Sequence, residues 1–141
     1  MSGIDELPRR DEYQRAFARY WEVLADAYLR ADTSRLDEVL DGPLLQETVR
    51  AIRALKAEGR GVAFHIKTDY ASVFNPSRSP TDFRVEHRYT FYSEWVDLAS
   101  GRVLGIRDER QRSQRSTLLI KVNDTWKAVN VSQDTVEGEG H

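Results

Sequence analysis

The period of the hydrophobic pattern changes near Gly59, and this change restricts the fold more than any other feature. Before Gly59, apolar residues recur every three to four positions, as they do on an amphipathic helix. After Gly59, they alternate with polar residues over long stretches, as they do on a half-buried strand. Helices followed by strands predict one α+β domain in which the helices cover one face of an antiparallel sheet.

Three helices are predicted before Gly59. The first covers residues 10–31 and has one aromatic face and one charged face. A short second helix is expected after the capping oxygens of residues 32–34 and ends at Gly42, and the third begins at Pro43. Because a helix that packs only on helices would more often show leucine, the first helix is expected to lie on the sheet. Its inward residues are Tyr13, Phe17, Tyr20, Trp21, Leu24 and Tyr28.

Four strands are predicted after Gly59, over residues 62–74, 82–95, 103–122 and 125–135. Alternate residues of the first strand, from Val62 to Phe74, are expected to share one buried face. Alternate residues of the second strand, from Phe83, are expected to do the same. A strand of about fifteen residues extends about 50 Å, so the sheet must coil. The predicted architecture is three N-terminal helices on a curved four-stranded antiparallel sheet, shaped like a cone with a hollow at its wide end.

Composition bounds the organisation and the partners. A chain of 141 residues forms one domain, 1–141, with an ordered core over about residues 8–135, and the polar, glycine-rich residues 137–141 are expected to be disordered. The net charge of -2 disfavours nucleic acid as a partner. No apolar run is long enough for direct membrane insertion, so the chain is expected to be soluble, either cytoplasmic or as the extracytoplasmic domain of a longer anchored protein.

The aromatic residues that face the predicted hollow have two interpretations. They can fill the core, or they can line a ligand pocket. His87 is the one titratable group on this face, and burial lowers the pKa of a histidine, so it can act as a general base or form a structural hydrogen bond. From the helix and the second strand, the candidate ligand-binding residues are Tyr20, Trp21, Tyr28, His87, Tyr89 and Phe91.

The third strand is polar on both faces between Arg107 and Thr117. Either this stretch projects into water and forms cross-strand ion pairs, or side chains such as Asp108 and Arg110 line the wide end of the cone. An inward arginine beside Asp108 would favour an acidic small molecule or a polar substrate, because guanidinium binds carboxylate in a bidentate fork.

The sequence contains no recognisable cofactor or metal motif. The three histidines, His65, His87 and His141, are dispersed, and cysteine is absent. There is no glycine-rich phosphate loop and no nucleophile elbow. We therefore predict neither a cofactor nor a metal.

Several short motifs resemble the nuclear transport factor 2-like, or cystatin-like, superfamily over nearly the whole chain. Within it, they are most similar to the branch typified by the intermembrane-space domain of a chloroplast division protein and its bacterial relatives. The resemblance implies a fold, together with binding or interaction domains that have no shared catalytic set. The motifs are Tyr20-Trp21, Leu36, Val39-Leu40, Leu44-Leu45, Gly59 and the turn from Asp124 to Trp126.

Two functions follow from the residues and the resemblance together. The leading one is a non-catalytic binding domain for a small ligand or a protein partner, acting through the sheet and its hollow as a homodimer. The alternative is a small-molecule isomerase, cyclase or hydrolase, with His87 as base, Tyr89 as hydrogen-bond donor, and Asp108 or Arg110 orienting the substrate. A hairpin that such enzymes of the superfamily insert between their helices is missing here.

Overall fold

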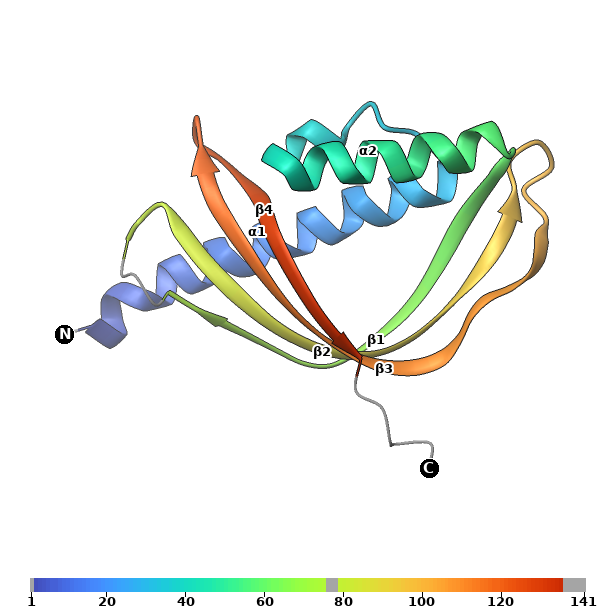
Figure 1. The fold of residues 1–141 in the computed structure, drawn as a ribbon. Helices are drawn as coiled ribbons and strands as arrows, with labels where there is room; N and C mark the ends of the chain where they lie inside the picture. Colours follow the sequence, from blue (N-terminus) through green and yellow to red (C-terminus); the bar gives the residue numbers. More distant parts are fainter. Residues whose placement is uncertain (1, 76–78, 136–141) are drawn as a thin grey trace.

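A strongly curved antiparallel sheet holds two α-helices against its concave face (Figure 1). The computed structural model describes residues 2–75 and 79–135. The four strands lie in the sheet in the order in which they follow one another in the chain. The elements are α1 (Ser2–Arg30), the short 3₁₀ turn η1 (Leu36–Glu38), α2 (Gly42–Ala57), β1 (Arg60–Phe74), β2 (Asp82–Asp97), β3 (Val103–Val122) and β4 (Thr125–Thr135).

The predicted α+β class and the curved four-stranded antiparallel sheet are confirmed, but the predicted number of helices is wrong. Only three residues, Leu36–Glu38, form helical turns in place of the second helix. The reason lies in the backbone that follows. Val39 O accepts a hydrogen bond from Ala128 N at 2.7 Å, and Asp41 N donates to Ala128 O at 3.1 Å. Residues that pair with β4 in this way cannot also continue a helix.

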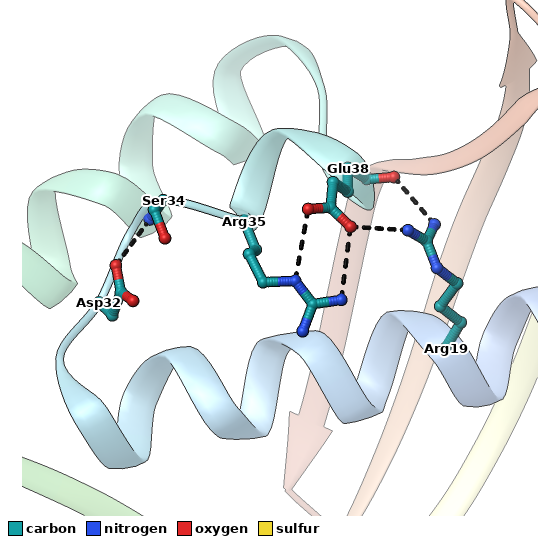
Figure 2. A network of polar contacts seen from close by, with 5 residues as sticks. All are labelled: Arg19, Asp32, Ser34, Arg35 and Glu38. Carbon is teal, nitrogen blue, oxygen red and sulfur yellow. Dashed lines mark hydrogen bonds and ion pairs between the residues drawn. The ribbon is translucent and has the colours of Figure 1, made fainter.

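Polar side chains fasten η1 to α1 (Figure 2). Glu38 accepts hydrogen bonds from Arg19 at 2.7 Å and from Arg35 at 3.3 and 3.4 Å. Asp32 accepts from the backbone N of Ser34 at 2.9 Å, which stabilises the turn after α1 and does not cap a helix. Asp32, predicted to cap a second helix, therefore stabilises a turn.

The aromatic face of α1 lies on the sheet, as its composition predicts. At the narrow end, the Tyr13 ring stacks on Phe83 of β2 at 4.2 Å, and Trp126 of β4 packs edge-on against both rings. Trp126 Nε1 donates a 2.6 Å hydrogen bond to Glu12 of α1. These contacts close this end with a packed aromatic core.

The expectation that one face of β1 stays buried from Val62 to Phe74 is wrong beyond Thr68. A β-bulge shifts the register between Thr68 and Tyr70, and a single extra residue exchanges the two faces of a strand. Tyr70 and Phe74 are consequently exposed, at 44% and 37%. Val73 takes the inward position instead, where it lies opposite the buried Val85.

The β2–β3 ladder is regular near the core and irregular near its far end. From Asp82 to Phe91 the pairing is continuous, and it then shifts register three times before Val96. β4 pairs with β3 only between Ser113 and Val122. The far half of β3, residues 103–112, therefore has one paired edge and one free edge among the residues that the structure describes.

No helix within residues 2–75 and 79–135 has the length and apolar character needed to cross a bilayer. The expectation of disorder over residues 137–141 concerns positions outside the described part of the chain.

Candidate functional site

A hollow of about 300 Å³ lies between the helices and the concave face of the sheet. This volume is at the lower end of the range for small-molecule sites. Aromatic and aliphatic side chains form most of the wall. The polar lining residues of β3 and β4 are Arg107, Asp108, Arg115 and Gln133. The lining residues are Tyr20, Trp21, Leu24, Ala25, Tyr28, Leu40, Leu44, Thr48, Phe64, Ile66, Tyr89, Phe91, Arg107, Asp108, Arg115 and Gln133.

The aromatic wall is built by α1 on one side and by β1 and β2 on the other. Trp21 packs edge-on against Tyr89 with ring centres 6.0 Å apart, and Tyr28 packs in the same way on Phe64 at 5.3 Å. Tyr89 and Phe91 lie on the same face of β2 because they are two residues apart. The helical and strand periodicities therefore bring distant aromatic residues to one space.

Asp108 enters the hollow within a hydrogen-bonded group. Its Oδ2 accepts from Ser93 Oγ at 2.5 Å and from an Arg107 guanidinium N at 2.6 Å. Arg107 also lies over the Trp95 ring, with its guanidinium carbon 5.4 Å from the ring centre. Consecutive residues, Arg107 and Asp108, both line the hollow because the β2–β3 register shifts between Ser93 and Glu94. The carboxylate is thus already neutralised by a neighbouring cation.

Arg115 enters the hollow from β3 without such a partner. Its guanidinium carbon lies 4.9 Å from the centre of the Trp21 ring. Arg115 Nε and Trp21 Nε1 are both buried, and neither has a hydrogen-bond acceptor among the described residues. Gln133 beside it is held in place, since its Nε2 donates to Ser113 Oγ at 2.8 Å and to Tyr89 OH at 3.3 Å.

The tyrosines of α1 are held in their neutral form. Burial raises the pKa of both Tyr20 and Tyr28, and the positive charge of Arg115 opposes this effect at each of them. The hydroxyl groups are consequently available as hydrogen-bond donors and acceptors at neutral pH.

His87 lies beside the hollow and not in its wall. Its Nε2 is 2.9 Å from Thr68 Oγ1, and the ring stacks on Tyr89 at 4.6 Å. Burial, followed by the charge of Arg115 directly opposite on β3, lowers the pKa of His87 to about 4, although Asp69 opposes this shift. The imidazole is therefore neutral at physiological pH.

A second, more open depression runs along α1 and β1 and includes His87. It has a volume of about 630 Å³ and a mostly apolar wall that includes Phe17, Ile66 and Val73. It exists because β1 is an edge strand whose inward residues are only partly covered by α1. Four residues border both spaces: Trp21, Ala25, Phe64 and Ile66.

Six of the eight residues predicted for a ligand site line the hollow: Tyr20, Trp21, Tyr28, Tyr89, Phe91 and Asp108. Arg110 lies elsewhere, in a depression with His65 and Tyr92 on the outer face of the sheet. Residues that sequence reasoning did not select include Arg107, Arg115 and Gln133. No signal in the sequence marks Arg115 as inward, because only the strand register places it directly opposite the inward His87.

Among the residues that the structure describes, no group of three or more histidine, aspartate or glutamate side chains has an arrangement that could hold a metal ion.

Comparison of the sequence with family models and with curated proteins finds no match. Comparison of the fold with solved structures finds similar chains. The intermembrane-space region of the chloroplast protein ARC6 is 16% identical, with a TM-score of 0.70 over 89% of this chain and 95% of that one.

Two bacterial proteins are similar along most of their length. A candidate scytalone dehydratase from Novosphingobium aromaticivorans has a TM-score of 0.62 at 15% identity, over 90% of this chain and 86% of that one. A nuclear transport factor 2-like superfamily protein from Salmonella enterica has a TM-score of 0.59 at 14% identity, over 93% and 94%. The chain therefore has the nuclear transport factor 2-like, or cystatin-like, fold.

Proposed function

We propose that this domain binds a small apolar ligand in the hollow between α1 and the sheet, and that it does so without catalysing a reaction. The observation that carries the proposal is the hollow itself, a space of about 300 Å³ walled by aromatic rings from α1, β1 and β2. Protein interiors are ordinarily close-packed, so an aromatic-walled space of this size favours a bound molecule.

The arrangement of titratable groups supports binding over catalysis. Asp108 Oδ2 already accepts hydrogen bonds from Ser93 Oγ and from an Arg107 guanidinium N. His87 lines the groove along β1 and not the hollow, packs against Trp21 and Tyr89, and is hydrogen-bonded to Thr68. A general base must reach the proton that it removes, whereas His87 lies outside the wall of the hollow and Asp108 Oδ2 is already engaged by Ser93 and Arg107.

The alternative, an isomerase, cyclase or hydrolase, requires His87 to reach a substrate. One of the similar structures is named as a candidate dehydratase, but a shared fold at 15% identity carries no activity by itself. The alternative would gain support if a ligand bound in the hollow displaced the Trp21 ring and exposed His87.

We also propose that two copies pair along the free edge of β3. Residues 103–112 pair with β2 on one side only among the described residues. Val103, Leu104 and Ile106 expose 56%, 57% and 48% of their surface there. A free edge with exposed apolar side chains is a template for pairing with another strand, and a second copy offers the same strand in the same form.

Binding in the hollow can be tested with N-phenyl-1-naphthylamine, an uncharged dye that fluoresces in apolar sites. Leu44 lines the hollow and not the groove along β1, so Leu44→Trp should fill the hollow and weaken saturable dye binding by about tenfold or more. Leu29 is exposed on α1, and Leu29→Trp is the matched control that should bind normally.

The groove along β1 is tested separately. Ala18 lines only that groove, so Ala18→Trp covers it and should leave dye binding in the hollow unchanged. Dye binding that survives Leu44→Trp but is abolished by Ala18→Trp would place the ligand in the groove and contradict the proposal.

A further inference from the structure

We propose that the ligand of the hollow is a flat apolar acid whose carboxylate is bound by Arg115 and Trp21 Nε1. This inference rests on the proposed function, since it names the chemical class of ligand that the same site takes. It is carried by the charges and the unpartnered donors of the polar end of the hollow.

The described residues that line the hollow carry two cations and one anion. Arg107 and Asp108 form an ion pair at 2.6 Å, so their charges cancel locally. Arg115 carries a guanidinium and has no carboxylate partner among the described side chains. The described lining residues therefore leave one positive charge uncompensated, which favours an anionic ligand.

Two side chains that line the hollow, Trp21 and Arg115, each carry a buried donor that lacks an acceptor among the described residues. Trp21 Nε1 can only donate a hydrogen bond, and Arg115 Nε is also a donor only. Neither atom has an acceptor within the part of the chain that the structure describes, whereas most buried donors in proteins have one. The guanidinium carbon lies 4.9 Å from the Trp21 ring centre, so one group with two acceptor oxygens can serve both side chains. A carboxylate has that geometry.

The remaining wall determines the rest of the ligand. Tyr28, Phe64, Tyr89 and Phe91 enclose the space with ring faces and edges, which suits a planar, unsaturated or aromatic body. Gln133 is hydrogen-bonded to Ser113 and Tyr89, so it fixes one boundary of the polar end. A hollow of about 300 Å³ accepts a body of about two fused rings.

The test compares 2-naphthoate with its uncharged isostere 2-naphthamide by titration calorimetry at pH 7. Wild-type protein should bind the acid about tenfold to a hundredfold more tightly than the amide, as expected for charge-assisted hydrogen bonds. Arg115→Gln should abolish this preference, because it weakens binding of the acid much more than binding of the amide. Arg115→Lys keeps the charge but loses the fork, and should retain part of the preference.

The matched control is Arg110→Gln, which removes the same charge from the outer face of the same strand and should bind both probes as the wild type does. Equal affinity of the wild type for acid and amide would overturn the carboxylate inference while leaving the proposed function intact. So would a preference that Arg115→Gln does not reduce. Failure of both probes and of N-phenyl-1-naphthylamine to bind would overturn the proposed function itself. Melting temperatures of the variants separate these outcomes from loss of folding.

Discussion

His87 Nε2 lies 2.9 Å from Thr68 Oγ1, and this hydrogen bond joins β2 to β1 beside the bulge that exchanges the faces of β1. The same imidazole packs against Phe17 and Trp21 of α1. His87 thus contacts both β1 and α1 through a neutral ring. Protonation of that ring must lower the free energy of unfolding, because folding lowers its pKa.

The first prediction concerns pH. The pKa of His87 is lowered from 6.5 to about 4 by folding, so the unfolded state binds more protons between these values. The free energy of unfolding should therefore fall as the pH decreases from 7 towards 4, by about 2 kcal/mol at pH 5 from this residue. Urea unfolding of the wild type and of His87→Gln measures this directly. Parallel pH dependences of the two proteins would contradict the prediction.

The second prediction concerns Gly61, at the start of β1. A Cβ at this position would overlap the backbone carbonyl of Leu29, near the end of α1. Gly61→Ala must push these elements apart and should destabilise the fold by about 2 kcal/mol or more. Gly101→Ala is the control: its φ of +75° is unfavourable for alanine, but there is space around it, so about 1 kcal/mol is expected. Equal losses in thermal or urea unfolding would show that α1 and β1 are not in close contact here.

The third prediction concerns Asp108. Asp108→Asn keeps the shape of the side chain and removes the charge that neutralises Arg107. The positive potential of the hollow should increase, and 2-naphthoate should bind about threefold to tenfold more tightly, whereas 2-naphthamide should not change. Calorimetry with both probes measures the difference. Weaker binding of the acid would indicate that Asp108 contacts the ligand as an acceptor.

The fourth prediction concerns assembly. If two copies pair along β3, then Leu104→Lys together with Ile106→Lys should convert the dimer to a monomer, because like charges would meet across the new ladder. Sedimentation equilibrium gives the mass. Tyr70→Lys, on the opposite edge strand β1, is the control and should stay dimeric. A monomeric wild type would remove the basis of this prediction.

The sequence predicts the fold class because the change of hydrophobic period is unambiguous on either side of Gly59. It predicts one face of β1 wrongly because both faces carry apolar residues beyond the bulge. Tyr70 and Phe74 continue the alternation in sequence, whereas Val73 is the residue that meets Val85 in the sheet. Local pattern cannot choose between these registers, and long-range packing does.

The second helix is predicted wrongly for a similar reason. Residues 34–40 have helical caps and spacing, but the backbone of Val39 and Asp41 is recruited by Ala128 on β4, which is distant in sequence. Tertiary hydrogen bonds therefore override a local helix signal in this segment.

The site could be predicted only where the strands alternate clearly. The aromatic residues of α1 and β2 have one apolar face each, so their meeting follows from periodicity. The polar stretch of β3 has no apolar face, so the sequence alone could not assign Arg107, Arg110 or Arg115 to an inner or outer position. The pairing of β2 with β3 decides these positions: the continuous register places Arg115, and the shifts beyond Phe91 place Arg107 and Arg110.

Those register shifts have a consequence for how the protein can change. The regular part of the ladder supports the aromatic core at the narrow end, where a single inserted residue would turn every following side chain around. The irregular part around Ser93 and Asp108 already contains residues on one strand that have no paired residue on the other. A one-residue insertion or deletion there can exchange the groups that meet a guest molecule while the rest of the domain stays as it is, so selectivity and foldability are separable in this chain.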